Sequence, residues 1–315
     1  MTDRREFDNT PTMDAGAKRT ALRACMVVSF AILLWRGAVH STRQDIRDAA
    51  HRHPNLLTPA DGTFAIWGII FTWMLAFVVS ECVWPSKTLH DDIHVLYGFF
   101  LCSSPCATLW MELFVAGYTS LSFVPIFLHW LLLFGAYLYV EDRIEPIVLT
   151  SVLFSSNAAA HIYRSKSRAD FWLIRAPFTV YWAWVCASAT VALNLLVEDM
   201  GLHSMSIYVF WCGMWVLANT VILIGTGDVP FACVALWTLV GIAQENYRRK
   251  QLVADVVRYS EYYALEVMAS VGAFVFAGLF AFLALHRWWR GPKGRRQPPP
   301  PLSSLPTTVV SYGTG

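Results

Sequence analysis

The chain has 315 residues, of which 56% are hydrophobic and 15% are charged, and its mean hydropathy is +0.45. This composition departs from that of soluble domains and is typical of a protein that lies largely in a membrane. The formal net charge is +2, with basic residues scattered over loops and tails, which argues against a nucleic-acid surface or an acidic partner.

The N-terminal residues 1–20 are polar with mixed charge and lack the pattern of a signal peptide, so we predict a retained tail. The apolar segment 21–39 then predicts a first membrane span. It contains Arg36 close to its end, where a long side chain can either reach the interface or make an inward polar contact. A polar loop, 40–62, follows it.

A polar turn with Pro59 and Gly62 leads into the apolar segment 63–84. At a rise of about 1.5 Å per residue such a helix is roughly 33 Å long, enough to cross the hydrocarbon core of a bilayer. Similar segments recur and predict an all-α, polytopic transmembrane bundle of about eight helices. The remaining expected spans are 95–117, 121–140, 171–197, 204–225, 229–246 and 263–287.

Two histidines precede the third span. His90 and His94 are four residues apart, which on a helix places both on one face, as zinc sites require. No third ligand is fixed by spacing, and the neighbouring aspartates also suit an interfacial helix start. We therefore predict no metal site, and His90 and His94 are the candidates if there is one.

Glu112 in the third expected span and His129 in the fourth are further ionisable residues inside the bundle. Ionisable groups within a membrane are candidates for function. Glu112 is close enough to the end of its span to lie at the interface. His129 is more central, where it is either a neutral hydrogen-bonding group between helices or part of a proton relay.

The longest internal loop, 141–170, has an apolar middle, 146–163, that is broken by serine and asparagine and predicts an amphipathic interfacial helix. The fifth span carries Pro177 in its first turns, where proline is tolerated. The C-terminal segment 288–315 is basic and rich in proline, which predicts disorder.

The seven cysteines all lie in apolar segments, their number is odd and no CxxC pair is present. These features predict reduced packing residues rather than a disulfide framework or a metal cage. They are Cys25, Cys82, Cys102, Cys106, Cys186, Cys212 and Cys233.

Lysine and arginine are distributed unequally between the two sides of such a bundle. With eight spans the two tails share one side, which carries 16 of the 24 Lys and Arg residues, against seven on the other side. The positive-inside rule then places both tails in the cytosol. The organisation we expect is a tail (1–20), a five-helix core (21–197), three further helices (198–287) and a second tail (288–315).

Several segments resemble the translocator protein family, also called tryptophan-rich sensory proteins or peripheral benzodiazepine receptors. The turn at Pro59 followed by Phe64-x-x-Trp67 is similar to the opening of that family's second helix. Trp110 lies in a segment similar to its third helix, although Ala107 stands where the family has asparagine. The segment 173–184 resembles its fifth helix, and 228–243 resembles a longer branch with extra C-terminal helices.

The resemblance implies a five-helix fold that binds porphyrins, sterols and aromatic drug-like ligands in a pocket among the helices. Flat aromatic side chains are suited to stacking on such ligands. The same side chains also serve simply to pack helices, and this alternative stays open. The residues implied for the pocket are Phe64, Trp67, Trp110, Pro177, Tyr181 and Trp184.

We therefore expect a multi-pass membrane protein that binds, senses or carries a flat apolar ligand, such as a tetrapyrrole or a sterol, and that is compatible with a homo-oligomer. The alternative is an ion- or proton-coupled transporter that uses Arg36, Glu112 and His129. An enzyme is the least favoured class, since none of the common catalytic motifs is present.

Overall fold

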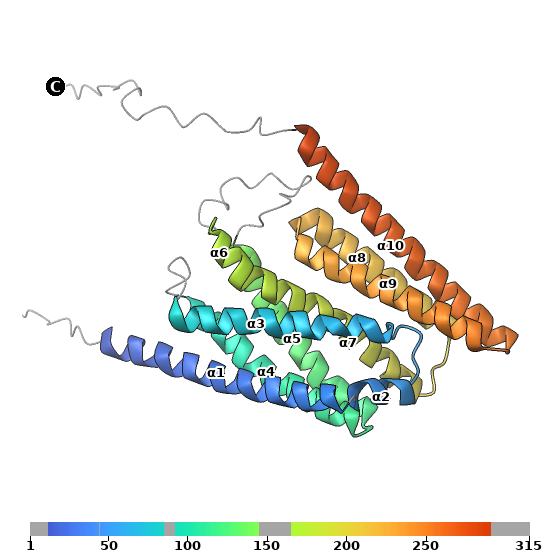
Figure 1. Ribbon diagram of the computed structural model, residues 1–315, viewed down its shortest axis with the longest axis horizontal. Helices are drawn as coiled ribbons and strands as arrows, with labels where there is room; N and C mark the ends of the chain where they lie inside the picture. The colour runs from blue at the N-terminus through green and yellow to red at the C-terminus, as the bar shows by residue number, and fades with distance from the viewer. Residues whose placement is uncertain (1–11, 44, 85–91, 145–164, 291–315) are drawn as a thin grey trace, which may run out of the picture.

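The computed structural model describes residues 12–43, 45–84, 92–144 and 165–290, which are helical almost throughout (Figure 1). The helices are α1 (Thr12–Thr42), α2 (Asp45–Arg52), α3 (Ile66–Val83), α4 (Ile93–Val115), α5 (Thr119–Arg143), α6 (Arg168–Asp170), α7 (Ala176–Asp199), α8 (Met205–Thr226), α9 (Val229–Leu252) and α10 (Val256–Arg290). A 3-10 turn, η1 (Asp61–Ala65), precedes α3, and a π-helical turn, η3 (Phe171–Arg175), precedes α7.

Seven helical segments in the described part of the chain are long and apolar enough to cross a membrane. This confirms the prediction of an all-α, multi-pass membrane protein. The eighth expected span, α9, is not among the seven: its apolar part ends at Ala243, and the polar residues Gln244, Glu245 and Asn246 lower the hydropathy of the expected span 229–246. It still lies beside α8 and α10, and it packs mainly on α10 (Figure 1).

The helices form two groups that lie side by side (Figure 1). In the first, α4 packs against α5 and α1, while α7 packs against α5 and α3. In the second, α9 packs against α8 and α10 and also reaches α7. The short connections between α4 and α5, between α8 and α9 and between α9 and α10 make the helices of each pair antiparallel neighbours. The turn between α8 and α9 needs a left-handed residue, which Gly227 supplies with a φ of 65°.

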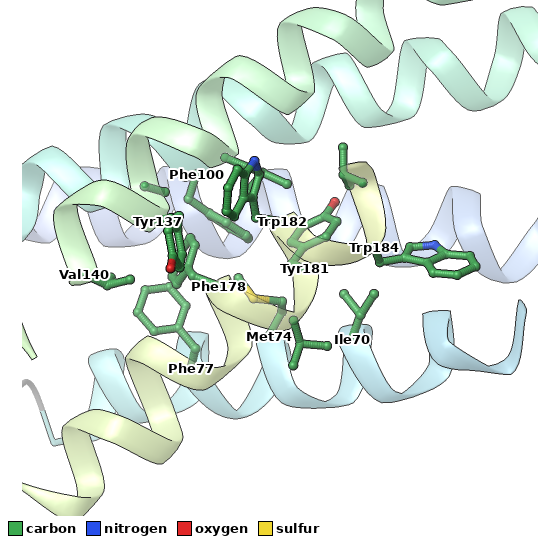
Figure 2. Close-up of a cluster of buried hydrophobic side chains, with 14 of the residues drawn as sticks. Ile70, Met74, Phe77, Phe100, Tyr137, Val140, Phe178, Tyr181, Trp182 and Trp184 are labelled. Carbon is green, nitrogen blue, oxygen red and sulfur yellow. The ribbon is translucent and has the colours of Figure 1, made fainter. Parts of the chain in front are cut away.

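Helix α7 is the most enclosed helix of the bundle. Its aromatic side chains Phe178, Tyr181 and Trp184 are almost fully buried. Figure 2 shows them between residues of α3, such as Met74, and residues of α4 and α5. The ring of Trp182 stacks on Tyr137 with centroids 4.4 Å apart. The apolar core of the first helix group is therefore built around this helix.

A fully buried ion pair joins the two helix groups. Arg175, the last residue of η3, binds Asp228 in the turn before α9, with Nη2 and Oδ2 2.8 Å apart, and neither side chain has any exposed surface. Arg175 also donates to the backbone carbonyls of Glu141 and Ile144 at the end of α5. One guanidinium thus holds three helix ends together.

The turn before α3 is held by the C-terminal helices. The backbone N–H of Ala60 donates to the carbonyl of Gly241 at 3.0 Å. Trp237 Nε1 donates to the Thr63 carbonyl at 2.9 Å, and Asn246 Nδ2 donates to the carbonyl of Leu56 at 2.8 Å. Helix α9 therefore fixes the stretch that leads into α3.

Some expected boundaries differ from those observed. Helix α1 begins at Thr12, inside the expected polar tail, because residues 12–20 contain good helix formers. Helix α2 forms within the expected loop 40–62, where Asp45 and Asp48 in its first turn and Arg52 in its last suit the helix dipole. The expected interfacial helix 146–163, His90 and most of the tail 288–315 lie outside the described residues. The cytosolic placement of both tails stays a prediction.

Candidate functional site

Five of the six predicted pocket residues come together around Trp67. Its ring centroid lies 6.2 Å from that of Trp110, 6.1 Å from that of Tyr181 and 6.2 Å from that of Trp184. Phe64 completes the group, 6.0 Å from Trp184 in an edge-to-face contact. We call these five residues the Trp67 cluster. They are supplied by η1 and by helices α3, α4 and α7.

The members of the Trp67 cluster differ in exposure. Trp110, Tyr181 and Trp184 are buried, whereas Phe64 and Trp67 are only half-buried. The edge-to-face geometry of several pairs is the arrangement that aromatic quadrupoles favour. Pro177, the sixth predicted residue, lies in the first turn of α7, about one turn before Tyr181. The cluster therefore presents Phe64 and Trp67 as the rings with free surface.

A pocket of about 570 Å³ lies beside Phe64 and Trp67, between α1 and α3. This volume falls within the range of about 300–1,000 Å³ that is usual for small-molecule sites. Trp67 and Phe71 form a stacked pair on its wall, with centroids 5.4 Å apart. The remaining lining residues are Leu34, Gly37, Ala38, His40, Ser41, Ile46, Arg47, Asp61, Phe64, Ala65, Gly68 and Met111.

A smaller cavity of about 70 Å³ lies where the two helix groups meet. Phe64 lines both spaces and therefore stands between them. A cavity of about 150 Å³ is known to bind benzene, and the smaller space has less than half that volume, too little for a polycyclic ligand. Trp110 and Trp184 line it together with Trp211, Cys212 and Trp215 of α8.

Polar residues gather at one side of the larger pocket. Arg36 donates to Glu112, with Nε and Oε1 2.6 Å apart, and His40 Nε2 lies 3.1 Å from the same carboxylate. The other ring nitrogen of His40 lies 3.2 Å from Asp45 Oδ2. Of the two alternatives for Arg36, the inward polar contact is the one observed. The side chains of Arg36 and Glu112 remain about one-third exposed.

His129 lies in a different part of the bundle. It is fully buried, its Nδ1 lies 3.0 Å from the Ser103 carbonyl oxygen, and its ring centroid is 5.1 Å from that of Tyr181. None of the contacts that the structure describes for His129 involves Arg36 or Glu112. The three ionisable residues of the transporter hypothesis are thus not joined in one polar path.

Metal-ligating side chains are not grouped in the described part of the chain. No set of three or more His, Cys, Asp and Glu residues there could hold a metal ion. His94 begins α4, while His90 lies outside the described ranges. The cysteines described are all free thiols.

Sequence reasoning missed the contribution of α8 and α2 to the two spaces. Trp211 and Trp215 are four residues apart and so share one helix face, a signal that predicts a common contact. Arg47 of α2 lines the larger pocket, and no pattern in the polar loop distinguishes it from Arg43 or Arg52.

The family model for TSPO-like proteins matches residues 20–282 of the chain. The chain belongs to the TSPO-like protein family. The match extends from α1 into α10, so α8, α9 and most of α10 lie within the matched residues. Neither a curated protein nor a solved structure matches the chain. The resemblance read from Phe64, Trp67 and the fifth span is confirmed at the level of the family.

Proposed function

We propose that this TSPO-like membrane protein binds a flat apolar ligand, such as a tetrapyrrole or a sterol, in the pocket between α1 and α3. The observation that carries the proposal is the volume of about 570 Å³ beside the stacked rings of Trp67 and Phe71. A flat ligand can extend such a stack, since offset stacking of aromatic rings is favourable.

Glycine residues give this pocket its open surface. A Cβ atom added at Gly68 meets nothing within 4 Å, so the chain leaves free space there. A Cβ atom added at Gly37 would lie 3.2 Å from the ring of Phe71, because α1 approaches α3 closely at that point. A larger side chain at Gly68 therefore fills the pocket without displacing the helices.

The test is a titration of protoporphyrin against the purified protein in detergent, followed by quenching of tryptophan fluorescence. We expect saturable quenching and at least tenfold weaker binding by Gly68→Leu, because the leucine occupies the ligand's space. Trp84→Phe is the matched control, since Trp84 is 77% exposed and lies outside the pocket. Non-saturable quenching, or equal affinity for Gly68→Leu and wild type, contradicts the proposal.

A second candidate function is proton-coupled transport, which the contact of Arg36 and His40 with Glu112 favours. A carboxylate that contacts both an arginine and a histidine can change protonation when a substrate approaches. This function predicts pH-dependent flux in liposomes that is lost in Glu112→Gln. Unchanged flux in this variant rules out proton-coupled transport through Glu112. A second variant, His129→Gln, tests whether His129 takes part.

A further inference from the structure

Arg47 is a cation without a partner in the larger pocket. Its side chain is half-buried, and within residues 12–43, 45–84, 92–144 and 165–290 it has no hydrogen bond or ion pair. Three other described arginines that are at least partly buried have anionic partners: Arg36 binds Glu112, Arg175 binds Asp228 and Arg249 binds Glu245. Arg23, which is also half-buried, donates to the hydroxyl of Tyr97. Among the arginines that the structure describes as at least partly buried, Arg47 is therefore the exception, and it lies in a pocket with aromatic walls.

The carboxylates around the pocket are already engaged. Asp61, which also lines it, has Oδ1 3.3 Å from His51 Nε2. Asp45 and Glu112 both contact His40. These contacts leave the charge of Arg47 without a counter-ion. A partly desolvated cation gains most from an anion that accepts two parallel hydrogen bonds, as a carboxylate does from a guanidinium.

We propose that the pocket selects flat apolar molecules that carry a carboxylate, and that Arg47 binds this group. The inference rests on the proposed function and narrows it to planar acids in preference to neutral sterols. The stacked rings of Trp67 and Phe71 on α3 hold the apolar body, while Arg47 on α2 binds the acid group. Specificity then arises because the neutral analogue leaves the guanidinium unpaired.

The experiment compares pyrenebutyric acid with its methyl ester, which share one flat body and differ in charge. Binding is measured by energy transfer from tryptophan to pyrene, with the full chain in phosphatidylcholine nanodiscs. We expect wild type to prefer the acid and Arg47→Gln to bind the acid about tenfold more weakly, a change of about 1.4 kcal/mol. Binding of the ester stays the same. Arg47→Lys keeps a preference for the acid because it keeps the charge.

Arg43→Gln is the matched control, since Arg43 is exposed and does not line the pocket. It should leave both affinities unchanged, and Arg47→Gln should unfold at the wild-type temperature because no partner is lost. Equal affinity of wild type for acid and ester, or an equal effect of Arg47→Gln on both, overturns the role proposed for Arg47. Either result leaves the proposed binding of a flat ligand intact. If neither probe binds saturably, the proposed function itself fails.

Lipid phosphate is the competing source of an anion. The comparison is therefore repeated in nanodiscs that contain phosphatidylglycerol. Persistence of the acid preference assigns the site to the carboxylate of the ligand. Loss of the preference in wild type shows that Arg47 is occupied by a lipid phosphate, which overturns the proposal.

Discussion

Helices α7 and α8 are both long and apolar, yet they lie in different environments. In the most apolar window of α7, 56% of the residues are buried within the protein, against 17% in α8. Hydropathy predicts that both cross the membrane but does not separate the helix at the centre from the helix at the edge. The difference lies in contacts: α7 touches α3, α5 and α9, whereas α8 packs mainly on α10 and α9. Burial therefore marks α7 as the helix on which the fold depends.

The largest loss of stability should follow from breaking the buried ion pair of Arg175 and Asp228 between the two helix groups. Asp228→Ala leaves Arg175 buried without its carboxylate, and loss of one partner of a buried pair costs about 3–5 kcal/mol. Thermal unfolding in detergent should show a large loss of stability.

Glu112→Ala is the comparison for that experiment, because its pair with Arg36 is about one-third exposed and should contribute about 1 kcal/mol or less. Equal losses in the two variants would mean that burial does not set the strength of these contacts.

Truncation of an aromatic side chain should cost more stability on α7 than on α8. Trp184→Ala on α7 should cost about 3 kcal/mol, because its side chain is 2% exposed and its contacts are not replaced. Phe210→Ala on α8, where the side chain is 56% exposed, should change stability by about 0.5 kcal/mol or less. Unfolding by a denaturing detergent measures both. A similar loss for the two would show that α8 is packed as closely as α7.

A smaller loss of stability is expected from a substitution at Gly241, where α9 contacts the turn before α3. A Cβ atom at Gly241 would lie 2.9 Å from Pro59 Cβ and also press on the Thr63 side chain. Gly241→Ala should therefore cost about 1–3 kcal/mol through overpacking. Gly213→Ala on α8 meets nothing within 4 Å and should be neutral or slightly stabilising. If the two glycines respond alike, α9 does not hold this turn tightly.

Much of the fold could be predicted from sequence because each apolar run is long enough to span a bilayer. The Trp67 cluster could also be predicted, since Phe64, Trp67 and the fifth span match a family pattern. The ion pairs could not, because Arg36 and Glu112 are 76 positions apart and no local spacing connects them. The two cavities depend on side-chain packing between helices, which hydropathy does not encode. The position of Arg47 in the pocket could not be predicted either, because it depends on how α2 packs against α1 and α4.

The central claim is that a flat ligand binds between α1 and α3 and not on the outer faces of α8 and α10. Photolabelling with a planar apolar diazirine, followed by mass spectrometry of the labelled peptides, tests this most directly. We predict labels on residues 64–71 of η1 and α3 and on residues 34–41 of α1, and these labels should disappear when unlabelled ligand is added. Labels confined to α8 and α10, or labels on α1 and α3 that excess ligand does not remove, would contradict the claim.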